Sequence, residues 1–264
     1  MIAAAIAVIG GLLLLIFASD RLVVSAVRLS EALGISAVLI GALVVGLGTS
    51  MPEMLVSALA SADGEIEIAM ANVVGSNISN VTLVLGVAAI ISAIVAEMRI
   101  LRREGVLMLA SLLALTAVLY DQEVERWEGG ALLFGFVVAV YLLIRWSMND
   151  AETVSLAEAE VREMVGGEHN VAWEALIGTV TLVLTVLGAR LLLGGALDIG
   201  EEIGLSDTFL GVMLGVGTSL PELATATAAI RRRESDLVVG NVLGSNLFNS
   251  LAVAGLAGVV GPGL

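Results

Sequence analysis

The sequence predicts an all-α polytopic membrane protein built from two inverted repeats, with helices interrupted near the middle of the bilayer. The composition is the first observation: the 264 residues are 58% hydrophobic and 14% charged, with a mean hydropathy of +1.03. A soluble domain of this length is far less apolar. The other two observations are a series of long apolar segments and a pair of polar motifs that occurs twice.

Eight apolar segments are long enough, or nearly so, to cross the hydrocarbon as helices, which takes about 20 residues. They are 2–19 (whose helix extends to about 30), 36–62, 66–95, 104–120, 127–147, 172–197, 206–230 and 236–260. The polar stretch 148–171 separates them, and we expect it to be a cytoplasmic linker loop that is part amphipathic helix. The chain therefore divides into a first half of five helices, 1–147, and a second half of three, 172–264.

The distribution of arginine predicts the orientation, because all 12 basic residues are Arg. With the N-terminus outside, one side of the membrane collects eight arginines and the other side only Arg126, as the positive-inside rule requires. The eight are Arg99, Arg102, Arg103, Arg145, Arg162, Arg231, Arg232 and Arg233. We expect a multi-pass protein of the plasma membrane with an extracellular N-terminus, an inner loop anchored by 231–233, and Asp20 hydrated near the inner end of the first helix.

Two polar motifs recur at an offset of 169 residues. Gly-Leu-Gly-Thr-Ser-Met-Pro-Glu at 46–53 returns as Gly-Val-Gly-Thr-Ser-Leu-Pro-Glu at 215–222, and Asn-Val-Val-Gly-Ser-Asn-Ile-Ser-Asn at 72–80 returns as Asn-Val-Leu-Gly-Ser-Asn-Leu-Phe-Asn at 241–249. The repeats span about 36–95 and 206–260. Five crossings separate the copies, so they are inverted, which is the architecture of many secondary transporters.

The polar residues of the motifs lie near the middle of their segments and share helix faces. Thr49 and Thr218 are segment midpoints, and Asn80 and Asn249 lie at or beside the midpoints of the following segments. Residues four apart lie on one helix face. The pairs with this spacing are Thr49 with Glu53, Thr218 with Glu222, Ser76 with Asn80, and Ser245 with Asn249.

A proline follows each Gly-x-Gly-Thr-Ser stretch. Pro52 and Pro221 lack an N–H, so the carbonyls of Gly48 and Gly217 lose their helical partners and the helices kink. Free carbonyls at this depth persist only where protein, water or an ion satisfies them.

The available donors predict a site for a hard cation. They are carboxylate, hydroxyl, amide and carbonyl oxygens, and the chain has no Cys and one histidine, His169, in the linker. Such a set suits Ca²⁺ or Na⁺ and not Zn²⁺ or Cu²⁺. Two facing carboxylates, Glu53 and Glu222, repel unless one Ca²⁺, two Na⁺ or two protons neutralise them. An unoccupied site would be too costly to carry through an occluded state, which predicts obligate exchange.

These motifs resemble the two alpha repeats of sodium/calcium exchangers of the prokaryotic type, in the calcium:cation antiporter superfamily. The resemblance implies that Glu53 and Glu222 ligate the central Ca²⁺ and share in Na⁺ binding. It further implies backbone ligands around Gly46 and Gly215, Asn80 and Asn249 in the middle of the cluster, and hydroxyl ligands from Thr49, Thr218, Ser50, Ser219, Ser76 and Ser245. The Asn80/Asn249 pair departs from relatives that carry Asp in the second copy, so the formal charge of the site is −2.

The family pattern is five plus five helices, whereas this chain shows five plus three. All the ligands implied by the resemblance are nevertheless present, because the missing pair would follow the second motif. In the family the first and sixth helices slide over the core as a gate, and here they correspond to about 2–30 and 172–200.

The sequence therefore predicts an antiporter that exports Ca²⁺ against Na⁺ entry by alternating access. H⁺ or another cation as the driving ion is the main alternative, and a cation channel is a further one. An intramembrane enzyme using Glu53 and Glu222 as acid and base is disfavoured because no nucleophile or catalytic metal set accompanies them. We expect no cofactor and no nucleic-acid partner: the partners are the lipid bilayer and the transported Ca²⁺ and Na⁺, and self-association is left open.

Overall fold

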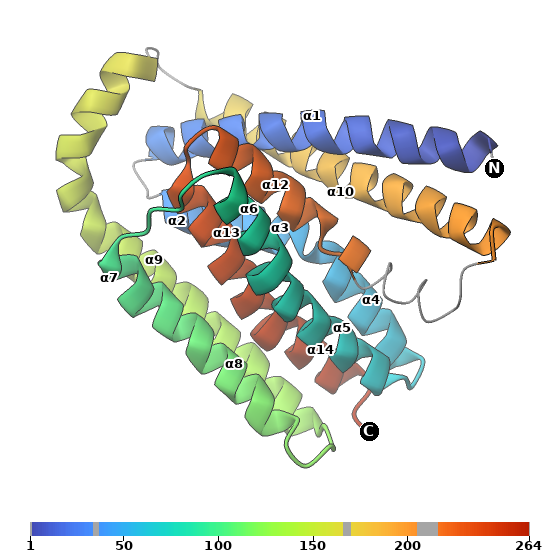
Figure 1. The fold of residues 1–264 in the computed structure, drawn as a ribbon. Coiled ribbons are helices and arrows are strands. Elements are labelled where there is room, and N and C mark those ends of the chain that lie inside the picture. Colours follow the sequence, from blue (N-terminus) through green and yellow to red (C-terminus); the bar gives the residue numbers. More distant parts are fainter. Residues whose placement is uncertain (1, 34–36, 166–169, 205–215, 264) are drawn as a thin grey trace.

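The computed structural model describes residues 2–33, 37–165, 170–204 and 216–263, and these ranges contain helices and no strand. Figure 1 shows them as a bundle of helices. The bundle includes helices that are long and apolar enough to cross a membrane, which confirms the predicted class. The elements of the first half are α1 (Ile2–Leu33), α2 (Ala37–Ile40), η1 (Gly41–Gly46), α3 (Leu47–Thr49), α4 (Met51–Ala62), α5 (Ile66–Ser79), η2 (Asn80–Val84), α6 (Leu85–Ile91), α7 (Met98–Ile100), η3 (Leu101–Gly105), α8 (Val106–Val118) and α9 (Arg126–Val165). Those of the second half are α10 (Val171–Glu202), α12 (Leu220–Arg231), α13 (Ser235–Phe248), η4 (Asn249–Val253) and α14 (Ala254–Val260).

The eight predicted segments are largely helical where the structure describes them, although the helix of segment 66–95 ends at Ile91. Five helices are long and apolar enough to cross a membrane, and the pair 38–49 and 51–62, bent by 45°, makes a sixth span. Segment 104–120 is helical, although α8 alone is short, with 13 residues. Segment 206–230 is described only from residue 216. Helix α9 continues to Val165, so helix covers most of the stretch that we expected to be a linker loop.

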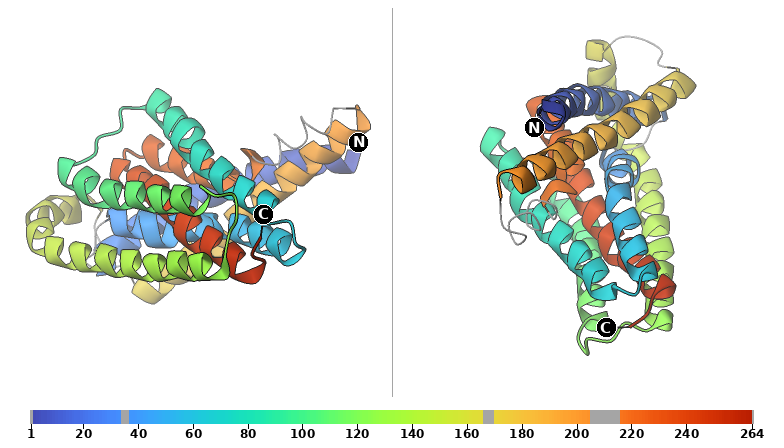
Figure 2. Two further views of the ribbon diagram at one scale, coloured as in Figure 1. Left: turned by 90° about the horizontal axis from the view of Figure 1, so that it is seen from below. Right: turned by 90° about the vertical axis from the view of Figure 1, so that its right-hand side faces the viewer.

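The helices α1 and α10 form a layer of their own across one end of the bundle (Figures 1 and 2). They run antiparallel, and glycines bring their backbones together. A methyl group on Gly188 would lie 2.7 Å from the backbone nitrogen of Leu15, and one on Gly195 would lie 2.6 Å from the carbonyl oxygen of Ala4. Backbones this close leave the two helices little freedom to slide past each other.

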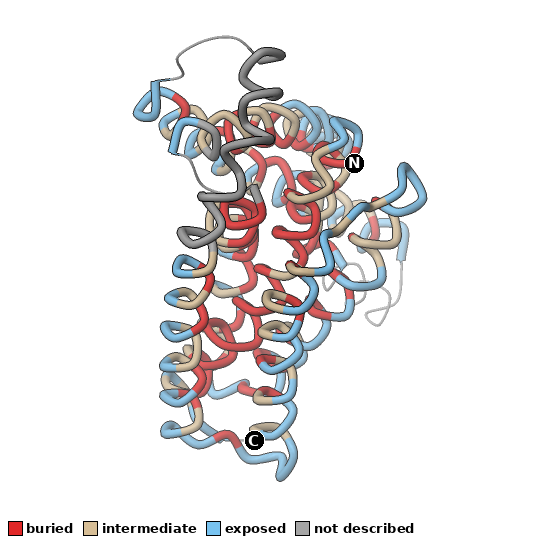
Figure 3. Tube along the Cα trace, turned by 90° about the vertical axis from the view of Figure 1, so that its left-hand side faces the viewer, coloured by how far each residue is buried: buried red, intermediate tan, exposed pale blue. Residues whose placement is uncertain are grey.

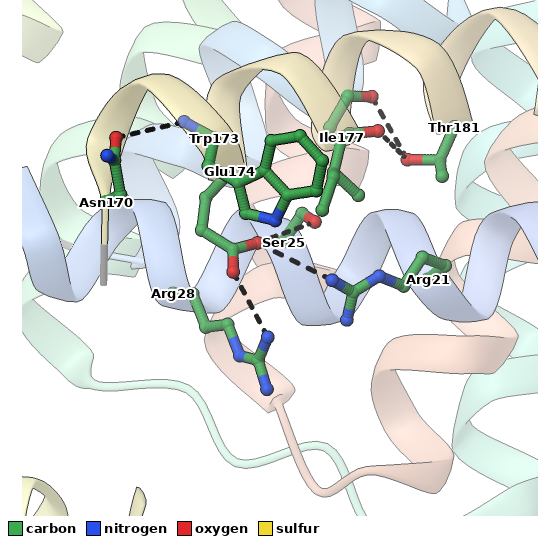
Figure 4. Close-up of polar contacts among 9 residues, drawn as sticks. Arg21, Ser25, Arg28, Asn170, Trp173, Glu174, Ile177 and Thr181 are labelled. Atoms are coloured by element: carbon green, nitrogen blue, oxygen red, sulfur yellow. Dashed lines mark hydrogen bonds and ion pairs between the residues drawn. The ribbon is translucent and has the colours of Figure 1, made fainter. Parts of the chain in front are cut away.

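An ion cluster fastens one end of this pair (Figure 4). The buried side chain of Glu174 on α10 accepts hydrogen bonds from Ser25 (3.0 Å) and Arg28 (3.1 Å) of α1, and Arg21 lies 3.9 Å away. The two repeats are offset by 169 residues, and the residue at this offset before Glu174 is Ala5, which has no carboxylate. The clamp therefore has no counterpart at the matching position of the first repeat. A buried charge that loses its partner is strongly destabilising. The clamp therefore favours movement of α1 and α10 as one body.

The segment from α13 to α14 forms the core of the bundle. In its most apolar stretch of 18 residues, 83% of the residues are buried. Figure 3 shows the buried residues gathered along the middle of the bundle. Two glycines let α13 touch the backbone of the first repeat: a methyl group on Gly240 would lie 2.4 Å from the carbonyl oxygen of Val38, and one on Gly244 would lie 2.4 Å from Cα of Ala42.

The corresponding helix of the first repeat is far less covered, although the motif is the same. In the most apolar 18-residue stretch of α5–α6, only 33% of the residues are buried. A methyl group on Gly75, the counterpart of Gly244, would meet nothing within 4 Å. The hairpin of α8 and α9 packs against α13, η4 and α14. No equivalent hairpin covers α5 in the described part of the chain. The inverted symmetry therefore holds for the motifs but not for their packing.

This asymmetry predicts opposite effects of one substitution at two matched positions. Gly244→Ala should destabilise the protein by about 1–3 kcal/mol, because the added methyl forces α13 away from η1. Gly75→Ala should be neutral or stabilise by up to about 1 kcal/mol, since alanine is the better helix former. Thermal unfolding of both variants in detergent measures the difference. Equal effects would show that the two glycines have equivalent surroundings.

Candidate ion-binding site

Both first motifs break their helices at the serine, in the same backbone conformation. Ser50 has φ −85° and ψ 6°, and Ser219 has φ −87° and ψ 8°. A new helix then begins, α4 or α12, with its proline at the N-terminus and its glutamate in the first turn. The N-terminus of a helix carries partial positive charge, so each glutamate lies where a carboxylate is best tolerated. The predicted interruption is thus present in both copies.

The two glutamates are buried, with 1% of each residue's surface exposed. They are close enough to repel each other electrostatically. The carboxylate of Glu222 accepts a hydrogen bond from Ser50 (2.9 Å) and is adjacent to Thr49. In the mirrored arrangement, the carboxylate of Glu53 lies beside Thr218. Each carboxylate therefore meets the Thr-Ser break of the other repeat, and neither half makes the site alone.

The second motifs supply a further set of buried polar groups. The turns η2 and η4 widen the helix locally, beginning at Asn80 and Asn249, and such π-type turns are frequent at functional sites. η2 contacts α12, while η4 contacts α4. Each asparagine therefore lies on a turn that contacts the glutamate-bearing helix of the other repeat.

Many of these groups lack a hydrogen-bond partner of normal geometry in the described structure, although buried polar atoms are usually paired. The unpaired atoms include both carboxylate oxygens of Glu53, Oε2 of Glu222, the hydroxyls of Ser76 and Ser219, and both side-chain amide atoms of Asn80 and Asn249. Buried oxygen atoms left unpaired around two carboxylates are the donor set for a hard cation.

The structure brings together most of the predicted ligands. Ser245 donates to the carbonyl of Gly46 (3.3 Å), which joins the second motif of one repeat to the first motif of the other. The remaining predicted residues that are described are all buried, at 8% exposure or less: Thr49, Ser50, Glu53, Ser76, Asn80, Thr218, Ser219, Glu222 and Asn249. Gly215 lies outside the described residues.

Two supporting asparagines were absent from the predicted ligand set. Asn241 donates to the backbone carbonyl of Glu222 (3.3 Å) and to the hydroxyl of Thr225 (3.2 Å). Asn72 donates in the same way to the carbonyl of Glu53 (3.3 Å) and to Ser57 (3.0 Å). Their sequence signal was their recurrence at the common offset. They tie the second helix of each repeat to the residue that carries the carboxylate.

No cluster of three or more Asp, Glu or His side chains is present among the described residues. The charged groups of this buried set are two carboxylates, and its other oxygens are neutral. Such a set is less charged than that of a dedicated storage site, which suits an ion that must also be released.

Interrupted, inverted helices around a buried polar centre define the class of secondary transporters. The chain belongs to the sodium/calcium exchanger protein family, whose model matches residues 3–145 and 173–264. The unmatched interval lies between the two halves. The family assignment made from the paired motifs is confirmed, and with it a transmembrane antiporter rather than an enzyme family.

Relatives match along the chain. It is 38% identical over 270 residues to the putative antiporter CaxA of Alkalimonas amylolytica, covering 100% of this chain and 83% of the relative. It is 31% identical over 286 residues to the sodium/calcium exchanger MaX1 of Methanosarcina acetivorans, covering 96% and 81%. The solved sodium/calcium exchanger from Methanococcus jannaschii superposes with a TM-score of 0.84 at 29% identity, covering 99% of this chain and 83% of that one.

The supporting role of Asn241 predicts a loss of ion affinity without loss of a ligand. Asn241→Ala should weaken Ca²⁺ binding by about tenfold or more, the usual cost of removing a group that orients a metal ligand. Calorimetric titration of the purified protein measures this affinity. Asn170→Ala is the control, because it removes the N-cap of α10 and costs about 1 kcal/mol of stability. The control should bind Ca²⁺ as the wild type does, and equal loss in both variants would refute the specific role.

Proposed function

We propose that this protein exchanges Ca²⁺ for Na⁺ across the membrane, with Glu53 and Glu222 as the central ligands shared by the two ions. The observation that carries the proposal is the pair of buried, mutually repelling carboxylates, each adjacent to the Thr-Ser break of the other repeat. The family membership and the solved exchanger structure support a calcium/cation antiporter. The relative MaX1 is named a sodium/calcium exchanger.

The charge of the site explains why exchange is coupled. Two carboxylates at low dielectric repel and are each costly to bury. One Ca²⁺ or two Na⁺ cancels their formal charge of −2, and a third Na⁺ would make the cycle electrogenic. During the change from one open state to the other, the site passes through an occluded state that excludes water. That change is favourable only when cations are bound. The protein without bound cations therefore does not switch between its open states. After one type of ion is released, the other type must bind before the site can face the first side again.

Protons are the competing driving ion, because two protons also neutralise two carboxylates. The neutral part of the site favours Na⁺. Hydroxyl and amide oxygens from Ser76, Ser219, Asn80 and Asn249 surround the centre without partners. A proton bound to a carboxylate needs no such additional oxygens, whereas Na⁺ needs several to replace its hydration shell.

The layer of α1 and α10 is the element that we assign to alternating access. One face of α10 covers both breaks: Leu182 packs against Gly48, and Leu193, three turns further on, packs against Gly217. The close backbone contact and the Glu174 clamp join α10 to α1. A rigid slide of this pair would uncover one break while covering the other, which is the motion that exposes a central site to alternate sides.

Conservative substitution of the glutamates tests the assignment. Glu53→Gln and Glu222→Gln should each abolish Ca²⁺ uptake by proteoliposomes loaded with Na⁺, because a single remaining carboxylate cannot balance a divalent ion. Glu67→Gln, on an exposed residue in the first turn of α5, is the control and should transport normally. Wild-type vesicles loaded with K⁺ or with acidic buffer complete the design. Uptake driven by protons but not by Na⁺ would overturn the driving ion, and uptake without a counter-ion would overturn exchange.

We also infer that the N-terminus lies outside the cell in the plasma membrane, from the arginine distribution. The chain contains no cysteine, which makes a clean background for single-cysteine labelling. Cysteine at Glu123, in the exposed turn between α8 and α9, should react with an impermeant maleimide in intact cells. Cysteine at Arg233 should react only after the membrane is opened. The reverse pattern would invert the assigned orientation.

A further inference from the structure

A groove of about 640 Å³ opens between α1 and α12, next to α10. Most of its lining is apolar and includes Leu12, Ile16, Phe17, Leu220 and Leu223. One end is polar and is formed by Asp20, Arg231 and Arg232. The groove lies apart from the buried carboxylates, and no part of the proposed exchange uses it.

The position of the groove in the bilayer follows from the two helices that form its walls. Helix α1 has no charged residue before Asp20, and α12 ends at Arg231, the first residue of the arginine triplet. Arg232 donates two hydrogen bonds to Asp20, at 2.8 and 2.6 Å, so the two transitions from apolar to charged lie at the same level. That level is the membrane surface, since charged side chains avoid the hydrocarbon. The apolar part of the groove then lies at the depth of acyl chains, and its polar end at the depth of headgroups.

The charges at the polar end leave one cation available. Asp20 is paired with Arg232 by two parallel bonds, which occupies both of its carboxylate oxygens. Arg231 lines the groove and is attracted electrostatically to Asp20, but no hydrogen bond or ion pair of Arg231 is found among the described residues. The rim therefore carries one net positive charge, at the place where a phosphate would lie.

We propose that this groove binds one anionic phospholipid, with its phosphate at Arg231 and an acyl chain along Leu12, Ile16 and Leu223. A lipid fits because the groove changes from apolar to cationic at the same depth at which a phospholipid changes from chain to headgroup. Basic pockets between membrane helices bind anionic headgroups in this way. A soluble anion would leave the apolar part uncovered, and a neutral lipid would leave the net positive charge of the rim unbalanced.

Bound lipid would touch both parts of the transporter. One wall of the groove belongs to α1, which is clamped to α10, and the other wall belongs to α12, which carries Glu222. An occupant that contacts both walls favours the arrangement in which the groove is open. The lipid composition of the membrane would thereby act on the movement of the α1–α10 layer against the core.

Native mass spectrometry of the delipidated protein tests the proposal, with phosphatidylglycerol or phosphatidylcholine added back. Wild type should retain one phosphatidylglycerol in preference to phosphatidylcholine by about fivefold, the contribution expected of one arginine at the membrane surface. Arg231→Gln should reduce this ratio to about one. Arg233→Gln is the matched control, because it removes the same charge from the same loop but does not line the groove. It should keep the preference.

Ala224→Trp provides the test of the apolar part. Ala224 lines the groove and is half-buried, so a tryptophan there should fill the space and abolish retention of both lipids. Equal losses in Arg231→Gln and Arg233→Gln would show general surface attraction and refute the site. Retention of lipid by Ala224→Trp would refute the groove as its location, and equal retention of both lipids by wild type would refute the choice of an anionic headgroup. Thermal unfolding of each variant confirms that it is folded, and the readout does not depend on ion exchange.

Discussion

Two carboxylates held close together where water is excluded are the constraint on which the rest of the structure depends. Glu53 and Glu222 are tolerated because each lies in the first turn of a helix and each faces hydroxyls of the opposite repeat. We propose that a bound cation balances both charges. The helix breaks at Ser50 and Ser219 exist to place them there. A fold that contributes one carboxylate from each half must bring both halves together before it has a site.

The surroundings of this centre divide into a core and the layer of α1 and α10, to which we assign alternating access. Helix α13 is pressed against the first repeat through glycines, while α1 and α10 lie across the bundle and are joined by close backbones and by Glu174. Exact symmetry would place a second carboxylate at the position matched to Glu174, which is occupied by Ala5. Packing of α5 and α13 also differs. The two copies of the motif therefore share their polar residues but differ in packing among the described residues.

Much of the fold and of the site could be predicted from sequence, for reasons that are local. Apolar length predicts helices, and spacing by four places Thr49 and Glu53 on one face. The roles of Asn72 and Asn241 were missed, because an asparagine near the helix middle has many possible acceptors and only the packed structure selects the carbonyl of the glutamate. The pairing of Asp20 with Arg232, 212 residues away, was equally invisible.

By itself the sequence determined the chemistry: a membrane protein, two inverted copies of one motif, oxygen ligands suited to a hard cation, and membership in the exchanger family. These follow from residue types and short spacings, which do not depend on how the helices pack. The tertiary structure alone decided that each carboxylate faces the break of the other repeat, that α13 is enclosed while α5 is not, and that an amphipathic groove separates α1 from α12. Each of these depends on contacts between segments far apart in the chain, and no local pattern encodes which surfaces meet.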